Sequence, residues 1–309
     1  MKKNAIIILI LVGIFLAVSS CEKDISIDLP RPEDKLVVEG YIINGEFPYV
    51  FLTKNAGYFD MVDSASLITM MVFSDSVKIT VSDGTNSTQL SPALLPLFPY
   101  LGYTCNDFKG EVGKTYRLDI EYDNRKYFAH TTIPTPIDID SVWFSPFKNQ
   151  DTLGLLNFSF FDPPETDNYY AIHTKVEGEQ LGFYKPFMVP HIRDDMFDNG
   201  KEIFFLGLTK GDGTNSFFFE EQEDEEWVNS VVYGKNTIVN LRLSSLDAEH
   251  YQFWNSYYRH FITWGNPFTN PASIKSNIKG DPSLGIWGGY GTNIVRAHIT
   301  DSAKVNILR

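Results

Sequence analysis

The sequence predicts a mainly β protein made of two β-sandwich-like domains, the second of which carries one amphipathic helix. Short segments with alternating polar and apolar residues recur along the chain, turn-forming dipeptides separate them, and only one long segment has the spacing of an amphipathic helix. The chain has 309 residues, of which 43% are hydrophobic. At roughly 150 residues a domain, this length is enough for two packed cores.

The beginning of the chain is predicted to be an export signal followed by a tether. Two lysines precede an apolar run over 5–18, which is shorter than the about 20 apolar residues that span a membrane. Val-Ser-Ser-Cys follows and ends at Cys21, which is the lipobox pattern of bacterial lipoproteins. We therefore expect 1–20 to be a cleaved signal peptide, Cys21 to carry lipid such as palmitate, and 21–34 to be the lipidated tether.

Charge and the tether limit the partners that the protein can have. A formal net charge of -13 leaves no basic face for phosphate, so nucleic acid is excluded as a partner. Glu22-Lys23-Asp24 resembles the export signals of Bacteroidota surface lipoproteins, and the alternative is a solvated linker. We expect a protein that is anchored to the outer membrane by lipid and faces the cell surface.

Residues 35–134 are predicted to form the first domain, an immunoglobulin-like β-sandwich. Each predicted hairpin contains a dipeptide that favours a tight turn, namely Asn44-Gly45, Asp83-Gly84 or Asp123-Asn124. Because the strands alternate polar and apolar residues, each should have one buried and one exposed face. The predicted strands are 35–43, 47–54, 77–82, 87–90, 115–122 and 126–133.

Residues 135–309 are predicted to form the second, β-rich domain. Ile133-Pro-Thr-Pro-Ile137 supplies the boundary, since two prolines stiffen the chain and interrupt strand pairing. A glycine-rich segment over 284–291 is expected to form turns or tightly packed backbone. The predicted strands are 140–144, 153–161, 168–176, 202–208, 216–220, 236–243 and 294–299.

One helix is predicted near 245–264, within the second domain. Ser244-Ser-Leu-Asp247 matches a capping box, which would begin the helix, and Gly265-Asn-Pro267 would end it. Apolar and aromatic residues with helical spacing predict the face that packs on a sheet. These residues are Leu246, His250, Trp254, Tyr257 and Phe261.

Several of these segments together resemble a known family, in the order in which the family has them. The segments are Leu36-Val-Val-Glu-Gly-Tyr41, Lys114-Thr-Tyr-Arg-Leu118, Asp167-Asn-Tyr-Tyr170, Asn266-Pro-Phe268, Ser276-Asn-Ile278 and Gly285-Ile-Trp-Gly-Gly-Tyr290. They look like the Bacteroidota lipoproteins catalogued as domain of unknown function 4249. One departure is Trp287, where the family leads us to expect phenylalanine, and another is a hydrophobic insertion over 92–100.

The resemblance carries expectations about fold and partners. It implies that the first domain is similar to the transthyretin-like, carboxypeptidase-regulatory-like sandwiches, which have no peptidase activity. It also implies a partnership with a TonB-dependent outer-membrane transporter, with a role in nutrient uptake. No catalytic residue of the family carries over to this sequence.

The residues themselves predict no enzyme. The six histidines are scattered, and the sequence contains neither a zinc-binding His-Glu-x-x-His nor the Gly-x-Ser-x-Gly turn of serine hydrolases. With Cys21 lipidated, Cys105 is the remaining thiol, and we expect it to be a small buried apolar residue. A hydrolase that uses loop carboxylates stays a third alternative, because the separation of two carboxylates cannot be derived from sequence.

Acidic loops give one candidate site, for Ca²⁺. Six of the seven residues over 220–226 are acidic, which favours a solvated loop, with Ca²⁺ binding as the alternative. Asp194, Asp195 and Asp198 lie in another turn-rich loop and raise the same alternative. No other cofactor is expected.

Aromatic residues give the second candidate site. Tyr258 and Trp264 lie off the apolar face of the predicted helix, while Trp287 and Tyr290 belong to the glycine-rich segment. They are either core residues or a platform for a ligand or partner. The sequence therefore favours a non-enzymatic accessory or ligand-binding partner of a transporter, and the alternative is a glycan- or peptide-binding module that works alone.

Overall fold

The fold is mainly β, as predicted, and two sheets contain its strands. The computed structural model describes residues 35–55, 68–96, 100–147, 150–164, 167–179, 182, 191–194, 202–210, 232–263, 273–300 and 304–308. The part from Asp34 to Arg309 forms one compact unit. Cys21, Asp195, Asp198, Trp264 and the acidic run over 220–226 lie outside the described residues, as does the strand predicted at 216–220.

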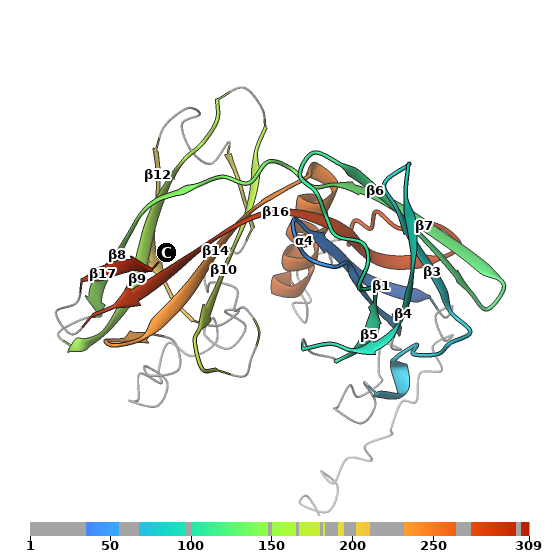
Figure 1. Ribbon diagram of the computed structural model, residues 1–309, viewed down its shortest axis with the longest axis horizontal. Coiled ribbons are helices and arrows are strands. Elements are labelled where there is room, and N and C mark those ends of the chain that lie inside the picture. Colours follow the sequence, from blue (N-terminus) through green and yellow to red (C-terminus); the bar gives the residue numbers. More distant parts are fainter. Residues whose placement is uncertain are drawn as a thin grey trace, which may run out of the picture. The chain divides into compact units, whose positions relative to one another are not determined.

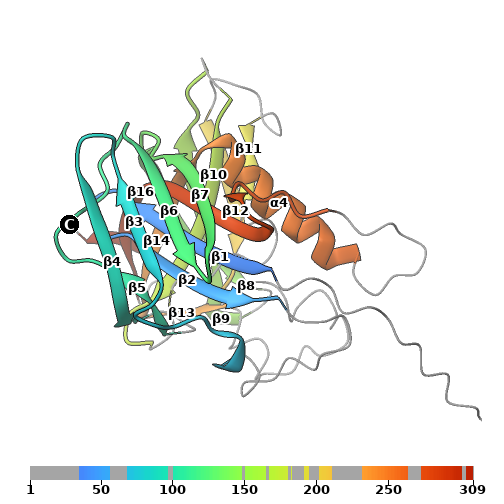
Figure 2. The same cartoon turned by 90° about the vertical axis from the view of Figure 1, so that its right-hand side faces the viewer.

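The elements largely follow the predicted ranges (Figures 1 and 2). The strands are β1 (Leu36–Ile43), β2 (Tyr49–Lys54), β3 (Lys78–Ser82), β4 (Ser87–Leu94), β5 (Leu101–Thr104), β6 (Thr115–Tyr122), β7 (Arg125–Thr132), β8 (Ile139–Phe147), β9 (Gln150–Phe161), β10 (Tyr169–Val176), β11 (His191–Arg193), β12 (Glu202–Leu208), β13 (Tyr233–Gly234), β14 (Ile238–Leu246), β15 (Lys279–Gly280), β16 (Ser283–Ile299) and β17 (Val305–Leu308). The long helix is α4 (Ala248–Thr263), and among the described residues no helix is long and apolar enough to cross a membrane.

Most described strands belong to one large sheet. Its order is β11-β10-β14-β16-β1-β2-β5-β4-β3-β6-β7-β15, with β17 paired to β16. The smaller sheet has the order β12-β9-β13, with β8 paired to β9. β1 and β16 are parallel, whereas β14 and β16 are antiparallel, so β16 is the strand that joins the N-terminal strands to the later ones.

The first core lies between strands of the N-terminal half. Its buried side chains come from all the strands β1 to β7, together with Trp287 from β16. Cys105 packs against this core and its thiol donates a hydrogen bond to the Phe108 carbonyl at 3.6 Å. Burial raises the pKa of the Cys105 thiol above its ordinary value, which keeps the group neutral.

The second core lies between the smaller sheet and β10, β14 and the C-terminal end of β16. Phe158 and Phe160 from β9 pack in it with Tyr170 from β10, and the Phe160 and Tyr170 ring centroids are 5.0 Å apart. A third, smaller cluster lies where α4 covers the large sheet. It includes Tyr41, Leu246 and Tyr290, with Trp254 and Phe253 of the helix packed against it.

The boundary predicted at 134/135 does not separate the strands of the two halves. Residues 283–290 of β16 pair with β1, and 290–298 pair with β14. The first core therefore contains Trp287, a residue from the range predicted for the second domain. β16 has 17 residues, so it is long enough to pair with β1 along its first half and with β14 along its second half.

The glycine-rich segment is part of β16 rather than a series of turns. A side chain on Gly285 would collide with the Val38 backbone, and one on Gly291 with the Pro134 carbonyl. Gly285 also has φ +125°, which a residue with a side chain rarely adopts. Tight backbone packing, one of the two structures expected for this segment, is confirmed.

Of two turns predicted from sequence, the structure contains the one at Asp123-Asn124, whereas the chain at Asn44-Gly45 has a different conformation. Asp123 and Asn124 both have positive φ, and Tyr122 pairs with Arg125 across them, which confirms the two-residue turn. Only Gly45 has positive φ in the first predicted turn. Asn44 instead reaches β16, where its Oδ1 accepts a hydrogen bond from the Thr292 amide at 2.5 Å and its Nδ2 donates to the Thr292 carbonyl at 3.2 Å.

The capping box predicted for the helix is wrong in its first member. Ser244 lies in β14, and its hydroxyl is hydrogen-bonded to that of Thr292 at 2.9 Å. Asp247 is the N-cap, since its Oδ1 accepts the His250 amide at 2.8 Å. Its Oδ2 accepts hydrogen bonds from the Thr131 hydroxyl at 2.5 Å and the Thr132 amide at 3.1 Å, so the cap also attaches the helix to β7.

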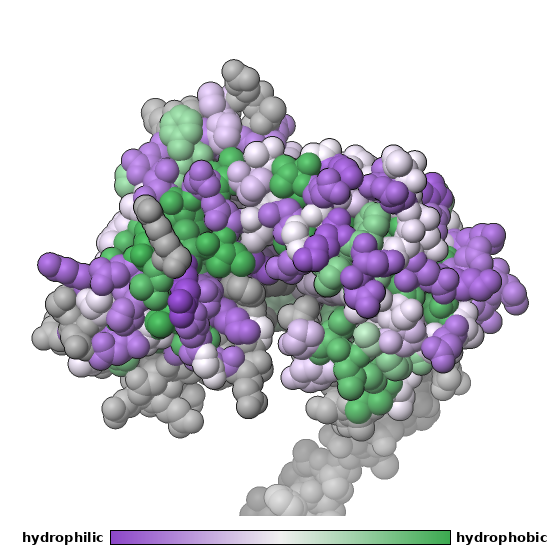
Figure 3. Space-filling model, viewed as in Figure 1, coloured by the Kyte–Doolittle hydropathy of each residue, from purple (hydrophilic) through white to green (hydrophobic). Residues whose placement is uncertain are grey.

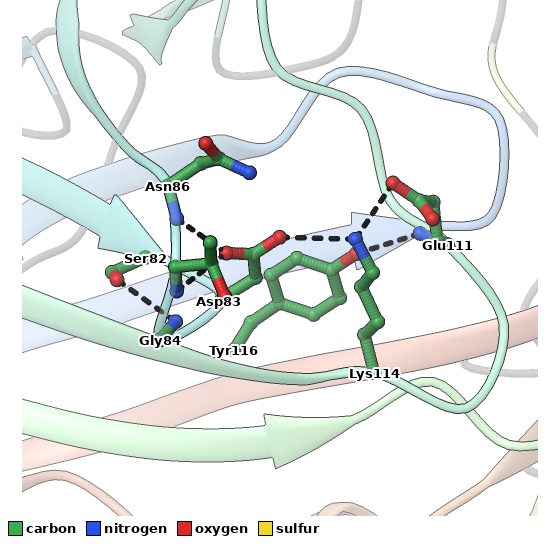
Figure 4. A network of polar contacts seen from close by, with 8 residues as sticks. Ser82, Asp83, Gly84, Asn86, Glu111, Lys114 and Tyr116 are labelled. Atoms are coloured by element: carbon green, nitrogen blue, oxygen red, sulfur yellow. Dashed lines mark hydrogen bonds and ion pairs between the residues drawn. The ribbon is translucent and has the colours of Figure 1, made fainter.

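A polar network holds the β3–β4 turn against the loop before β6 (Figure 4). The Asp83 carboxylate accepts the amides of Thr85 at 3.0 Å and Asn86 at 2.7 Å, and Lys114 Nζ lies 3.0 Å from it. Lys114 also pairs with Glu111 at 2.9 Å. These hydrogen bonds favour the charged carboxylate and hold the pKa of Asp83 well below its ordinary range.

We expect Asp83→Asn to lower the melting temperature at neutral pH and to leave it unchanged in strong acid. The pKa of Asp83 is lower in the folded than in the unfolded chain, so its stabilisation is present above the unfolded pKa of about 3.9 and is lost as the pH falls toward the folded value. Melting curves of both proteins across the acid range should therefore converge. Asp119→Asn, which alters an exposed pair with Arg117, is the control. A gap that persisted in acid would contradict this.

Candidate functional site

A pocket of about 740 Å³ lies on the face of the large sheet that α4 only partly covers. Figure 1 shows α4 below β16, between β1 on one side and β10 and β14 on the other, and Figure 2 shows it beside β10 and β11. The space-filling view in Figure 3 is hollowed between these two groups of strands. We call this hollow the sheet-face pocket. Its volume is in the range of small-molecule binding sites.

The register of the strands explains why residues far apart in sequence line one pocket. In an antiparallel pair, residues directly opposite each other point to the same face. Tyr49 is opposite Tyr41, and on the other side of the sheet Arg242 is opposite His173. All four residues line the pocket, together with Tyr290 from the strand between them.

Aromatic rings form the floor of the pocket. The ring of Tyr41 lies 5.6 Å from that of Tyr49 and 5.4 Å from that of Tyr290, between centroids, and Tyr49 lies 5.8 Å from Phe51. Burial raises the pKa of all three tyrosines above the ordinary value, so their hydroxyls stay protonated at neutral pH. Tyr41 and Tyr290 are almost completely buried, so the half-buried Tyr49 offers the most open ring of the floor to a ligand, with its neutral hydroxyl group.

Charged side chains surround this floor. The Arg242 guanidinium lies 5.8 Å from the centroid of the Tyr290 ring, and the positive charge of Arg242 lowers the pKa of Tyr49 and Tyr290 against the effect of burial. Lys175 follows on β10. On the N-terminal side, Glu39 accepts a hydrogen bond from the Tyr41 hydroxyl at 3.1 Å.

The rim of the pocket contains two further charges, Glu46 in the loop of the first hairpin and Lys109 in the loop before β6. Lys109 Nζ lies 4.9 Å from the centroid of the Phe47 ring, and Glu46 lies next to that ring in sequence. All three residues are exposed. The pocket lining as a whole thus has both signs of charge, with acids on the N-terminal strands and their loops.

Helix α4 supplies one wall through Trp254, and His250 fixes that wall. His250 is fully buried, with Nδ1 3.2 Å from the Gly289 carbonyl and Nε2 3.2 Å from the indole N–H of Trp254. The indole N–H can only donate, so Nε2 accepts and Nδ1 carries the proton toward Gly289. The imidazole thus connects the helix to β16 and orients the Trp254 ring, which also stacks on His191 at 5.2 Å.

The four aromatic residues singled out from sequence are not brought together. Tyr290 lines the sheet-face pocket. Trp287 is fully buried in the first core, where its indole N–H donates to the Tyr116 carbonyl at 3.1 Å, so its ring is not accessible to a ligand. Tyr258 is half-buried on α4 and does not line the pocket, and Trp264 is outside the described residues.

The helix face also differs from the predicted one. His250 is buried as expected, and Trp254 packs on the sheet, but Tyr257 and Phe261 are 44% and 37% exposed. Ser256 is buried instead, and its hydroxyl accepts the Lys275 amide at 2.8 Å. The segment before β15 thus contacts the helix at Ser256, a position that the predicted face did not include.

Asp194 is buried in the second half. Its carboxylate accepts a hydrogen bond from the Asn168 amide at 2.6 Å, and the Asp194 amide donates to the Asn168 carbonyl at 3.0 Å. These contacts join the end of β11 to the loop before β10. Within the ranges that the structure describes, no three metal-ligating side chains gather at one point.

Sequence reasoning missed most residues of the pocket. Tyr41, Tyr49, Lys175 and Arg242 were assigned to strands without a role. One signal was available: Glu39 and Tyr41 are polar or aromatic residues on the same face of a strand that is otherwise aliphatic. The partner strands β10 and β14 could not be derived, because strand pairing is set by tertiary structure.

Comparison with known proteins agrees with the resemblance in the sequence. A search of curated proteins found no match. A family model described as domain of unknown function (DUF4249) matches residues 22–293, which is most of the chain and includes every residue that lines the pocket. The chain therefore belongs to the DUF4249 family.

Proposed function

We propose that this protein is a ligand-binding lipoprotein of the outer membrane, on the cell surface, and a non-enzymatic accessory of a TonB-dependent transporter. The observation that carries the ligand-binding part is the sheet-face pocket, with its aromatic floor and its charged groups. The resemblance in sequence supports the partnership, and the Val-Ser-Ser-Cys21 pattern supports the anchor.

The chemistry of the pocket fits reversible binding. A site that holds a small molecule combines ring surfaces with a few polar groups that fix orientation. The half-buried Tyr49 supplies both, and the Trp254 wall adds a second aromatic surface. Lipid at Cys21 would keep the pocket and a transporter in one membrane, so that even a weak contact between them is effective.

The test of ligand binding uses the full chain, extracted gently from its own outer membranes. We expect a small molecule to co-purify, to be identified by mass spectrometry, and to be lost from Tyr49→Ala. Tyr258→Ala is the matched control, because it removes a tyrosine of α4 that does not line the pocket. Loss from Tyr258→Ala alone would move the site to the helix and overturn the pocket assignment. A TonB-dependent receptor should appear in the same extract, and its absence would refute the partnership.

The second candidate function, a glycan- or peptide-binding module that works alone, has one favourable observation. The exposed residues Tyr257, Phe261 and Ile262 lie on α4, outside the pocket, and could contact a polymer directly. This function predicts affinity without a transporter, which the co-purification experiment separates from the first.

We expect Cys21→Ala to release the protein from the membrane. Without the thiol there is no site for the diacyl group, and lipid burial at about 0.8 kcal/mol per methylene is what retains the chain. Cells are grown with alkyne-labelled palmitate and then fractionated. The natural chain should carry the label and be found in the membrane fraction, whereas the variant should carry no label and be absent from that fraction. Cys105→Ala, the control at the other cysteine, should keep both. Membrane retention of Cys21→Ala would refute the anchor.

A further inference from the structure

The two cations on the floor of the sheet-face pocket lie close together on the C-terminal side. Arg242 is on β14 and Lys175 on the neighbouring β10, where Arg242 is directly opposite His173. Residues 173 and 175 are two apart on one strand and point to the same face. The Arg242 and Lys175 side chains therefore enter the pocket from adjacent strands, and both are half-buried.

The charge of this corner contrasts with that of the whole chain. The chain has 39 acidic against 26 basic residues. Among the described residues, nevertheless, no carboxylate pairs with the Lys175 ammonium, whereas Lys114 and Lys126 have acidic partners. The two acids that line the pocket, Glu39 and Glu46, lie across β16 from Lys175 and Arg242, although Glu39 acts on the Tyr49 and Tyr290 hydroxyls together with Arg242. A positive corner in an acidic protein favours an anionic group of a ligand.

Hydroxyl groups and rings complete the corner. The Arg242 guanidinium lies over the Tyr290 ring, and its charge acts on the hydroxyls of both Tyr290 and Tyr49. A guanidinium beside neutral hydroxyls can donate several hydrogen bonds to one carboxylate. Tyr49 is half-buried and packs on the buried rings of Tyr41 and Phe51, so its own ring is the one on which a planar or cyclic body can lie.

We infer that the sheet-face pocket binds an organic acid, with its carboxylate held by Arg242 and Lys175 and its ring on Tyr49. This assignment rests on the proposed ligand-binding function and names the chemical class of the ligand. A carboxylate beside a ring occurs both in peptides with an aromatic C-terminal residue and in uronic acids of glycans. The Glu39 carboxylate faces the same floor and disfavours ligands with a second anionic group on that side.

Matched pairs of ligands test the class by calorimetry on the full chain in detergent. N-acetyl-L-phenylalanine and its carboxamide represent the peptide source, and glucuronic acid and glucose represent the glycan source. We expect at least one acid to bind about tenfold more tightly than its neutral partner, as one charge-assisted pair provides. The pair that shows the preference identifies the source.

Variants assign the preference to these side chains. Arg242→Gln should remove most of the preference for the acid while leaving the affinity for the neutral partner unchanged. Glu39→Gln should increase affinity for the acid, since it removes a repelling charge. Arg117→Gln, which removes a guanidinium from an exposed pair on β6, is the matched control and should change neither.

Three outcomes overturn the inference without affecting the proposed function. The first is equal binding of acid and neutral partner, and the second is failure of both acids to bind. The third is a preference that persists in Arg242→Gln. In each case a molecule that co-purifies with the natural chain and is lost from Tyr49→Ala would still support a ligand-binding pocket, now for a neutral or cationic ligand.

Discussion

Trp287→Ala is expected to destabilise the protein by about 3–5 kcal/mol, the range for removing a large aromatic residue from a core. Trp287 is fully buried in the first core, and its ring lies on Gly40 so closely that a Cβ there would be 2.9 Å from it. The substitution also leaves the Tyr116 carbonyl without the indole N–H that donates to it. Chemical unfolding in urea, followed by circular dichroism, measures the loss.

Two variants serve as controls for this prediction. Trp287→Phe keeps a ring in the core and should lose clearly less stability than Trp287→Ala. Trp143→Ala removes a half-buried tryptophan from β8 and should also have a smaller effect. If Trp287→Ala were as stable as Trp143→Ala, the packing of β16 against the first core would not depend on the Trp287 side chain. That result would contradict the prediction.

Gly288→Ala is expected to destabilise the protein by about 1–3 kcal/mol through overpacking. A Cβ at position 288 would collide with the His250 ring. That ring cannot move freely, because it is hydrogen-bonded to Gly289 on one side and Trp254 on the other. The added methyl group must therefore push α4 away from β16, which would also displace the Trp254 wall of the pocket.

A double-mutant cycle identifies this mechanism. His250→Ala alone should destabilise, because it removes both hydrogen bonds, but in its presence the further change Gly288→Ala should cost little. Gly234→Ala is the control, since a Cβ there meets only ordinary contacts, at 3.5 Å and beyond. Additive losses of stability in the cycle would show that Gly288 is required for another reason.

The local part of this structure could be predicted from the sequence. The Asp123-Asn124 turn, with both residues at positive φ, and the strands on either side of it depend only on neighbouring residues. The mainly β character and the position of α4 follow from alternation and helical spacing along short segments. These features are decided by backbone conformation and by which side chains can be buried within one element.

The register of the first hairpin shows where such prediction ends. A two-residue turn at Asn44-Gly45 would pair Ile43 with Glu46, so Tyr41 and Tyr49 would point to opposite faces. In the structure Tyr41 is opposite Tyr49, because Asn44 is bound to Thr292, 248 residues away. A shift of one residue in pairing therefore decides whether the pocket has its aromatic floor.

By itself, the sequence determined that the chain is mainly β, that it belongs with the DUF4249 proteins and that one helix precedes a glycine-rich segment. Only the tertiary structure decided what these parts do together. β16 pairs with β1 at one end and β14 at the other, which places Tyr41, Tyr290 and Arg242 on one surface. The physical reason is that strand partners are chosen by burial and hydrogen bonding across the whole fold, whereas a sequence pattern records only the preference of each segment.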